Sequence, residues 1–273
     1  MSDVKLHFVT TKSPCANALR NELILHYGNT QPCDATHIVA IGGDGTALSA
    51  WHCALQVRQK SQKTTPVYAV DCSDRSGHQG FLTNPELHAI GSLSARIHDA
   101  EPMQIHPLQA DCKMTGKNQP DTFFGFNEIA VKTNMYGTTR LSVAVFDQEK
   151  LINTFSITGD GVLVATPVGA SAYYKNAGGR LLAGFGPAFN HMLRVNEKYL
   201  SQTNKLGIQT ICATPAQNHS IPNTCQVHVL VGDAPFRPTC IMRDDGRVSD
   251  PIALAQIFQS RTPIAVLRDK QRD

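Results

Sequence analysis

The spacing of apolar and polar residues changes along the chain. Within residues 1–102, two kinds of spacing alternate. Short apolar runs of the kind that form buried strands are separated by longer stretches whose apolar residues recur at helical spacing. The runs predict strands over residues 4–10, 36–41 and 66–71, and the helical stretches predict helices over 13–27, 46–59 and 84–97. Strands that alternate with helices indicate a parallel sheet covered by helices, so we expect a Rossmann-like α/β domain here.

Two of these predicted helices begin with a residue that commonly caps a helix and is followed by proline. Ser13 precedes Pro14, and Asn84 precedes Pro85. Ser and Asn side chains accept hydrogen bonds from the first helical turn, and proline fits the first helical position because no N–H is needed there. We therefore expect both helices to start at these pairs.

The pattern changes near residue 103. From 103 to 254, short runs of alternating apolar and polar residues follow one another, and helical spacing is rare apart from a candidate helix near 170–180. Such alternation is typical of strands with one buried face. We expect an α/β domain over 1–102, to which the segment 255–273 returns, and a mostly β domain over 103–254.

Composition narrows the functional classes. The chain has 273 residues, of which 41% are hydrophobic and 17% charged, as in globular proteins. Its formal net charge is +3, and no run of Lys and Arg is dense enough to indicate a nucleic-acid partner. No apolar stretch approaches the ~18 residues that span a membrane. The first residues lack the pattern of a signal peptide, so we expect a cytoplasmic protein.

The cysteines and histidines do not form metal-ligand patterns. None of the eight cysteines belongs to a C-x-x-C pair, and the eleven histidines show no H-E-x-x-H spacing. We therefore expect reduced thiols that serve as small buried hydrophobes, and no metal held by the protein itself.

The stretch Gly42-Gly43-Asp44-Gly45-Thr46 lies where a predicted strand ends and a predicted helix begins. Ligands of open α/β sheets bind at this edge, and a helix N-terminus favours phosphate. A carboxylate would repel phosphate, so Asp44 needs another role: accepting a proton from a hydroxyl, holding a metal ion that bridges phosphates, or binding a sugar hydroxyl. All three fit phosphoryl transfer to an alcohol. The alternative is a tight turn in which Asp44 only caps the helix.

Two polar side chains, Asn127 and Glu128, stand inside the otherwise apolar stretch 124–131. Adjacent strand residues point to opposite faces, so one of the two would be buried, and an unpaired buried charge is costly. A ligand with ribose hydroxyls and adenine nitrogens would supply partners. A salt bridge would do so too, and both interpretations stay open.

Two further stretches are rich in glycine and small residues. Residues 77–84 contain Gly77 and Gly80 after a predicted strand, and a structural loop explains them equally well. Residues 158–179 open with Gly-Asp-Gly and then gather Gly, Ala, Ser and Tyr over 169–173. Small residues let the backbone approach a flat ring, on which a tyrosine can stack.

Taken in order, GGDGT at 42–46, GFLT at 80–83, Asn-Glu at 127–128 and GDGVLVATPVGASAY…AGG over 159–179 resemble the NAD kinase family. Members of that family phosphorylate the 2′-hydroxyl of the adenosine ribose of NAD to give NADP. An α/β region followed by a β-rich domain also fits the family's architecture. Lipid kinases and phosphofructokinases share the first turn but lack the Asn-Glu and T-P-x-G-x-x-A-Y stretches.

The resemblance implies a role for each matching residue. Asp44 would lie beside the 2′-hydroxyl as the catalytic base or activating carboxylate. Gly43, Gly45 and Thr46 would form the phosphate-facing turn. The NAD pocket would be formed by Phe81, Asn127, Glu128, Asp160, Thr166, Ser171, Ala172, Tyr173 and Asn176, with Lys175 extending its wall.

The resemblance also implies substrates and partners. NAD and ATP would be the substrates, with Mg²⁺ or another divalent cation accompanying ATP, and polyphosphate is a second donor to consider. Asp160 would contact the nicotinamide end of NAD from a neighbouring subunit, so a homodimer or homotetramer is expected, without nucleic-acid or membrane partners.

Two other functions stay open. The family usually has leucine where Gln79 stands and Ser or Thr where Val168 stands, and these departures fit a catalytically weak protein that senses NAD or NADP. A related kinase with the same GGDGT turn could act on a lipid or a sugar. A dehydrogenase is disfavoured because the G-x-G-x-x-G motif is missing.

Overall fold

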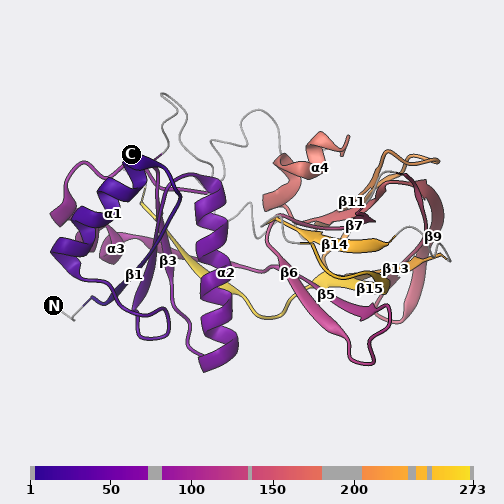
Figure 1. The fold of residues 1–273 in the computed structure, drawn as a ribbon, viewed down its shortest axis with the longest axis horizontal. Coiled ribbons are helices and arrows are strands. Elements are labelled where there is room, and N and C mark those ends of the chain that lie inside the picture. The colour runs from indigo at the N-terminus through magenta and orange to yellow at the C-terminus, as the bar shows by residue number, and fades with distance from the viewer. Residues whose placement is uncertain are drawn as a thin grey trace. The chain divides into compact units, whose positions relative to one another are not determined.

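The computed structural model describes residues 4–72, 82–134, 137–179, 205–232, 238–244 and 248–270 (Figure 1). By their contacts these residues fall into two compact units, and each is described by itself. The first unit contains residues 4–105 and 263–270, and the second contains the described part of 106–262. The second unit thus lies, in sequence, between two parts of the first.

The first unit is built on a five-stranded sheet with the order β1-β2-β3-β16-β4. These strands are β1 (Leu6–Thr10), β2 (His37–Ile41), β3 (Val67–Val70), β16 (Ile264–Arg268) and β4 (Glu101–Ile105). Neighbouring strands from β1 to β16 run parallel, as predicted. The edge strand β4 is antiparallel to β16, so the sheet is mixed rather than wholly parallel. Sheets of α/β proteins often have such an antiparallel edge.

Helices cover both faces of this sheet. On one face, α1 (Pro14–Tyr27) and α3 (Leu93–Asp99) share a core with apolar strand residues that include Val39, Ile41 and Val70. Successive strand residues point to opposite faces, so Ile38 and Ala40 lie on the other side. Figure 1 shows α2 (Asp44–Ser61) on that side, where it contacts β1, β2, β3 and β16.

The predicted starts of the helices were only partly correct. Ser13 occupies the N-cap position of α1 and Pro14 is its first residue, as expected, but the Ser13 side chain makes no capping hydrogen bond. Helix α2 begins two residues earlier than predicted, at Asp44. The helix predicted from residue 84 was wrong over its first part, because helical structure begins only at η1 (Ile90–Ser92). Asn84 does not cap a helix. Its N–H donates to Ala69 O at 2.7 Å, which ties this residue to the sheet.

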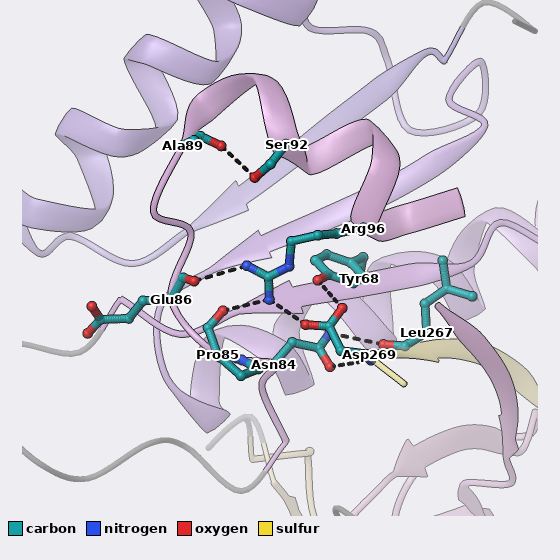
Figure 2. A network of polar contacts seen from close by, with 9 residues as sticks. All are labelled: Tyr68, Asn84, Pro85, Glu86, Ala89, Ser92, Arg96, Leu267 and Asp269. Carbon is teal, nitrogen blue, oxygen red and sulfur yellow. Dashed lines mark hydrogen bonds and ion pairs between the residues drawn. The ribbon is translucent and has the colours of Figure 1, made fainter. Parts of the chain in front are cut away.

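A polar network joins this part of the chain to the end of β16 (Figure 2). The Asn84 side chain accepts a hydrogen bond from the Asp269 N–H at 3.0 Å and donates one to Leu267 O at 3.1 Å. The Asp269 carboxylate accepts from Tyr68 Oη at 2.5 Å and forms an ion pair with Arg96. Arg96 also donates to two backbone carbonyls, those of Pro85 and Glu86. The network therefore connects α3, β3, β16 and the segment before η1.

The second unit is mostly β, as predicted, and consists of two antiparallel sheets. One has the order β12-β11-β10-β7-β14 and the other β6-β5-β15-β13-β8-β9. The first sheet contains β7 (Glu128–Thr133), β10 (Gly161–Ala165), β11 (Lys205–Ile211), β12 (Asn218–Pro222) and β14 (Thr239–Arg243). The second contains β5 (Leu108–Met114), β6 (Asp121–Gly125), β8 (Thr139–Asp147), β9 (Lys150–Gly159), β13 (Cys225–Val231) and β15 (Ile252–Gln259).

The inner faces of the two sheets form one core. In β8, Leu141, Val143 and Val145 are buried while the residues between them are not, which is the alternation that the sequence showed. The core includes buried residues from both sheets. A short helical segment after β10, with η2 (Val168–Ser171) and α4 (Tyr173–Asn176), interrupts the strands where a helix was expected.

The structure shows no disulfide among the eight cysteines, all of which lie in its described part. The expectation that they serve as buried hydrophobes holds for half of the set. Buried thiols are those of Cys72, Cys112, Cys225 and Cys240. In the part of the chain that the structure describes, no helix is long and apolar enough to cross a membrane.

Replacing Asn84 by alanine tests the polar network. The change removes the acceptor of the Asp269 N–H and the donor to Leu267 O, and the buried site offers little water in exchange. We expect the free energy of unfolding, measured by urea denaturation, to fall by about 1–3 kcal/mol. Asn118→Ala, in the exposed turn between β5 and β6, is the control and should change it by less than about 0.5 kcal/mol. Equal stability of the two variants would contradict the role given to Asn84.

Candidate functional site

The turn between β2 and α2 requires glycine at its first position. Gly42 has φ of +145°, and a Cβ there would lie 2.5 Å from Thr46 Oγ1. The next residue, Gly43, is the N-cap of α2, and its carbonyl accepts the N–H groups of Thr46 and Ala47 at 3.0 and 3.1 Å. The chain therefore turns sharply beyond the carboxyl end of β2 and enters the helix at Asp44.

Asp44 is held by a motif distant in sequence. Its Oδ1 accepts a hydrogen bond from the Leu82 N–H at 2.7 Å. Leu82 and Thr83, from the GFLT stretch, are buried, whereas Asp44 is partly exposed and Gly45 fully so. The structure thus brings the first two predicted motifs together. Phe81 and Gln79 lie outside the described residues.

The alternative in which Asp44 only caps the helix does not match this geometry. The cap position belongs to Gly43, and the Asp44 carboxylate reaches across to another segment rather than back to its own helix. A carboxylate on the first turn still gains from the helix dipole, so its position is electrostatically stable. Partly exposed, it is accessible to a hydroxyl group of a ligand.

In the second unit, Asn127 lies in the turn before β7, and Glu128 is the first residue of that strand. On one side the turn is held by Thr166, whose hydroxyl donates to Phe126 O at 2.6 Å and whose N–H donates to Asn127 O at 2.9 Å. Gly169, three residues after Thr166, lies so close to this turn that a Cβ on it would be 2.0 Å from Asn127 O. Thr166 is buried, so its hydroxyl shapes the turn.

The sequence pattern predicted that Asn127 or Glu128 would be buried, and in the structure it is Glu128. Its side chain is 7% exposed, and within the described residues no hydrogen-bond partner reaches its buried Oε2. Burial raises the pKa of this carboxyl to about 8, and the nearby negative charge of Asp244 adds to the shift. The salt bridge considered from the sequence is not formed with any described residue. Glu128 is therefore protonated at neutral pH.

Tyr173 lies in the same electrostatic environment. Burial raises the pKa of its phenol, and the neighbouring Cys212, Asp160 and Glu128 raise it further. Asp160 is partly exposed at the start of β10, where its backbone pairs with Ile211 and Thr133. The second unit thus gathers residues from two of the predicted stretches, 124–131 and 158–179.

The rest of the 159–179 stretch forms a short, partly exposed surface. Ser171, Lys175 and Asn176 are exposed, and Ala172 is partly buried. Tyr174, which the sequence analysis missed, fixes this surface: it is buried, and its hydroxyl accepts from Asn218 Nδ2 at 3.0 Å. The Tyr-Tyr pair in the sequence was the only signal for such an anchor.

Asp244 was also missed by the sequence analysis. It follows β14 and lies next to the Asn127–Glu128 turn, although it is distant from that turn in sequence. Each unit therefore carries its own cluster of predicted residues. Among the residues that the structure describes, no group of three or more His, Cys, Asp or Glu side chains is placed to hold a metal ion.

Comparison with known sequences finds NAD kinases that are similar to this chain. No family model matches it. It is 26% identical to the NAD kinase of Caulobacter vibrioides over 268 residues, which cover 98% of this chain and 92% of that protein. It is 30% identical over 181 residues to the NAD kinase of Brucella melitensis, an alignment that covers 66% of this chain and 64% of the relative. The NAD kinase of Xanthomonas campestris matches to the same extent, 30% over 181 residues.

Two solved structures share the fold. Yeast NADH kinase complexed with NADH superposes with a TM-score of 0.72 at 16% identity, covering 98% of this chain and 84% of the other. An NAD kinase from Archaeoglobus fulgidus in complex with ATP has a TM-score of 0.66, also at 16% identity, over 98% and 94% of the two chains. At this identity the likeness concerns the fold.

The protonated state of Glu128 gives a pH-dependent stability prediction. The pKa is about 8 in the folded chain and near 4.5 in the unfolded one, so the folded state binds this proton more tightly. That contribution is complete below pH 4.5 and is lost as the pH rises to about 8. Glu128→Gln should therefore match the wild type at pH 4.5 and be more stable at pH 8.5 by roughly 1–3 kcal/mol in urea denaturation.

The control for this prediction is Glu149→Gln, in the exposed hairpin between β8 and β9, which should show no such pH-dependent difference. A Glu128→Gln protein that is less stable than the wild type at pH 8.5 would mean that the carboxylate is ionised and paired in the folded state.

Proposed function

The chain belongs to the NAD kinase family, and on this premise we propose that it phosphorylates the 2′-hydroxyl of the adenosine ribose of NAD with ATP to give NADP. The observation that carries the proposal is the Asp44 carboxylate, which is held by the Leu82 N–H at the start of α2 and remains partly exposed. This arrangement suits an acidic group that receives a proton from an attacking alcohol.

The first unit supplies the groups for phosphoryl transfer in this proposal. Gly43, Gly45 and Thr46 form the phosphate-facing turn, because the first turn of α2 presents N–H groups and a partial positive charge. Asp44 orients or deprotonates the 2′-hydroxyl, which attacks the terminal phosphoryl group in line. Mg²⁺ or another divalent cation arrives with ATP as part of the substrate and neutralises phosphate charge.

The second unit supplies the groups that bind NAD. Asn127 and Glu128 bind ribose hydroxyls, and the buried Oε2 of Glu128 gains the hydrogen-bond partner that the described residues do not give it. Tyr173, Ser171 and Ala172 line the adenine and its ribose, and Asn176 extends that surface. Thr166 acts through the turn that it holds. Phe81, which the resemblance also assigns to NAD binding, lies outside the described residues.

The proposal includes an oligomer and a cellular location. Asp160 is partly exposed, which suits a contact with the nicotinamide end of an NAD bound mainly by another subunit. We therefore propose a homodimer or homotetramer in the cytoplasm. NADH is the second acceptor to test, because one structural neighbour is named as an NADH kinase. Polyphosphate is the second donor.

The relatives disfavour the other functions that the sequence left open. The relatives named above are NAD kinases, whereas none is a lipid or sugar kinase. Val168, one of the two departures from the family pattern, is buried in η2 and packs as an apolar residue. Because Val168 fills the interior of the second unit, its presence in place of Ser or Thr is compatible with an active enzyme.

Asp44→Asn tests the proposed chemistry. The amide keeps an oxygen that can accept the Leu82 N–H, but it cannot receive the proton of the alcohol. With NAD, ATP and Mg²⁺, and NADP detected by an NADP-specific dehydrogenase, we expect kcat to fall by about 10²–10⁴-fold while the KM for NAD changes little. Asp34→Asn, at an exposed site in the same unit, is the control. Full kcat in the Asp44 variant would refute this role, and a wild type that makes no NADP would refute the proposed function.

A further inference from the structure

The strand register brings Asp244 opposite the Asn127–Glu128 turn. β14 runs antiparallel to β7, and the last pair at this end joins Arg243 to Ile129. One step further along both strands, the next residues are Asp244 and Glu128. Two carboxyl groups therefore lie at the same end of one sheet, which the sequence does not reveal because more than a hundred residues separate them.

The Asp244 carboxylate accepts hydrogen bonds from the backbone N–H groups of this turn. Its Oδ2 accepts the Phe126 N–H at 3.0 Å and lies 3.5 Å from the Asn127 N. The opposite side of the same turn is held by Thr166, which donates to the carbonyls of Phe126 and Asn127. Asp244 and Thr166, the residues that directly follow β14 and β10, thus hold the backbone of residues 126 and 127 from both sides. The side chains of Asn127 and Glu128 are not needed to stabilise this backbone.

From this geometry we propose that Asp244 is a positioning residue for NAD: its carboxylate fixes the turn that presents Asn127 and Glu128 and controls the charge of Glu128. The proposal rests on the proposed NAD kinase function for its substrate. Asp244 need not touch NAD, because it acts on the backbone of the turn and on a neighbouring side chain.

The electrostatics of the site agree with the geometry. Among the residues that the structure describes, the ionisable groups that affect Glu128 or are affected by it are Asp244 after β14 and Tyr173 in α4. Tyr173 is uncharged at neutral pH, as a phenol ordinarily is, and burial raises its pKa further. Asp244 is therefore the negative charge that, together with burial, keeps Glu128 neutral. A neutral carboxyl can both donate to and accept from ribose hydroxyls, and it does not repel the pyrophosphate of a dinucleotide.

Two substitutions of Asp244 separate its effects. Asp244→Ala removes both the backbone hydrogen bonds and the charge. Asp244→Asn keeps an oxygen acceptor for the Phe126 N–H and removes only the charge. Asp250→Asn is the matched control, because Asp250 lies six residues further along, is exposed, and pairs with Lys117 instead of the turn.

The kinetic experiment measures KM for NAD and for ATP in the full-length protein. We expect Asp244→Ala to raise the KM for NAD about tenfold and to leave the KM for ATP unchanged. Asp244→Asn should raise the KM for NAD less, and Asp250→Asn not at all. An Asp244→Ala protein with the wild-type KM for NAD overturns the proposal, as does one in which both KM values rise together, since that indicates a general loss of structure. If the alanine variant does not fold, the asparagine variant and the control decide.

A second measurement does not depend on activity. The side-chain carboxyl carbon of Glu128, observed by NMR with ¹³C-labelled glutamate, should titrate with a pKa of about 8 in the wild type. It should titrate at a lower pH in both Asp244 variants and remain unchanged in Asp250→Asn. A titration that Asp244→Asn leaves unchanged refutes the control of Glu128 by Asp244. A wild type that binds no NAD but shows this shift refutes the proposed function alone.

Discussion

A backbone N–H group that leaves a strand loses its partner in the sheet and must find another acceptor, and this constraint organises both units of the molecule. Three polar side chains supply such acceptors, and two of the N–H groups that they bind, those of Asp269 and Phe126, come directly after strand ends. Asp44 accepts the Leu82 N–H, Asn84 accepts the Asp269 N–H, and Asp244 accepts the Phe126 N–H. In two of these cases the acceptor is a carboxylate from another part of the chain. The same hydrogen bonds that complete the backbone therefore fix the groups that we assign to the reaction.

Because the turn at Asn127 is held by its neighbours, Glu128 can remain buried without a protein partner. An ionised carboxylate in this position would be costly, and the negative charge of Asp244 makes it more so, which is why the protonated form prevails. A protein that needed only stability would gain by replacing such a group. Its presence is consistent with a site that reserves a hydrogen-bonding group for a ligand.

The two units divide the residues assigned to the reaction. The α/β unit presents the helix N-terminus and the carboxylate proposed for phosphoryl transfer, while the β unit presents polar groups suited to a dinucleotide. In the α/β unit the network around Asp269 ties β16 to α3 and β3 (Figure 2), so a strand from the far end of the sequence is bound to the sheet by side chains as well as by pairing. In the β unit, the buried Tyr174 fixes α4, whose neighbouring residues Lys175 and Asn176 are exposed.

The sequence by itself determined the features that depend on local pattern. Apolar runs and helical spacing predicted β1, α1, β2, α2 and β3, and alternation of apolar and polar residues predicted a β-rich second part. The sequence Gly-Gly-Asp-Gly-Thr predicted a turn, and the conformation of that turn requires glycine at position 42. Asn127 and Glu128 were found because polar residues in an apolar strand are conspicuous. Local pattern failed at Asn84, where an Asn-Pro pair indicates a helix start but the residue binds the sheet instead.

Only the tertiary structure decided which distant residues meet. It turned β4 antiparallel, joined Asp44 to Leu82, and placed Asp244 beside Glu128 through the register of β14 on β7. The physical reason is that register and long-range hydrogen bonds arise from the packing of whole sheets, whereas periodicity reports only the face on which a residue lies. The sequence therefore predicted that one of Asn127 and Glu128 would be buried, but it could not reveal that the negative charge of Asp244 adds to the effect of burial on Glu128.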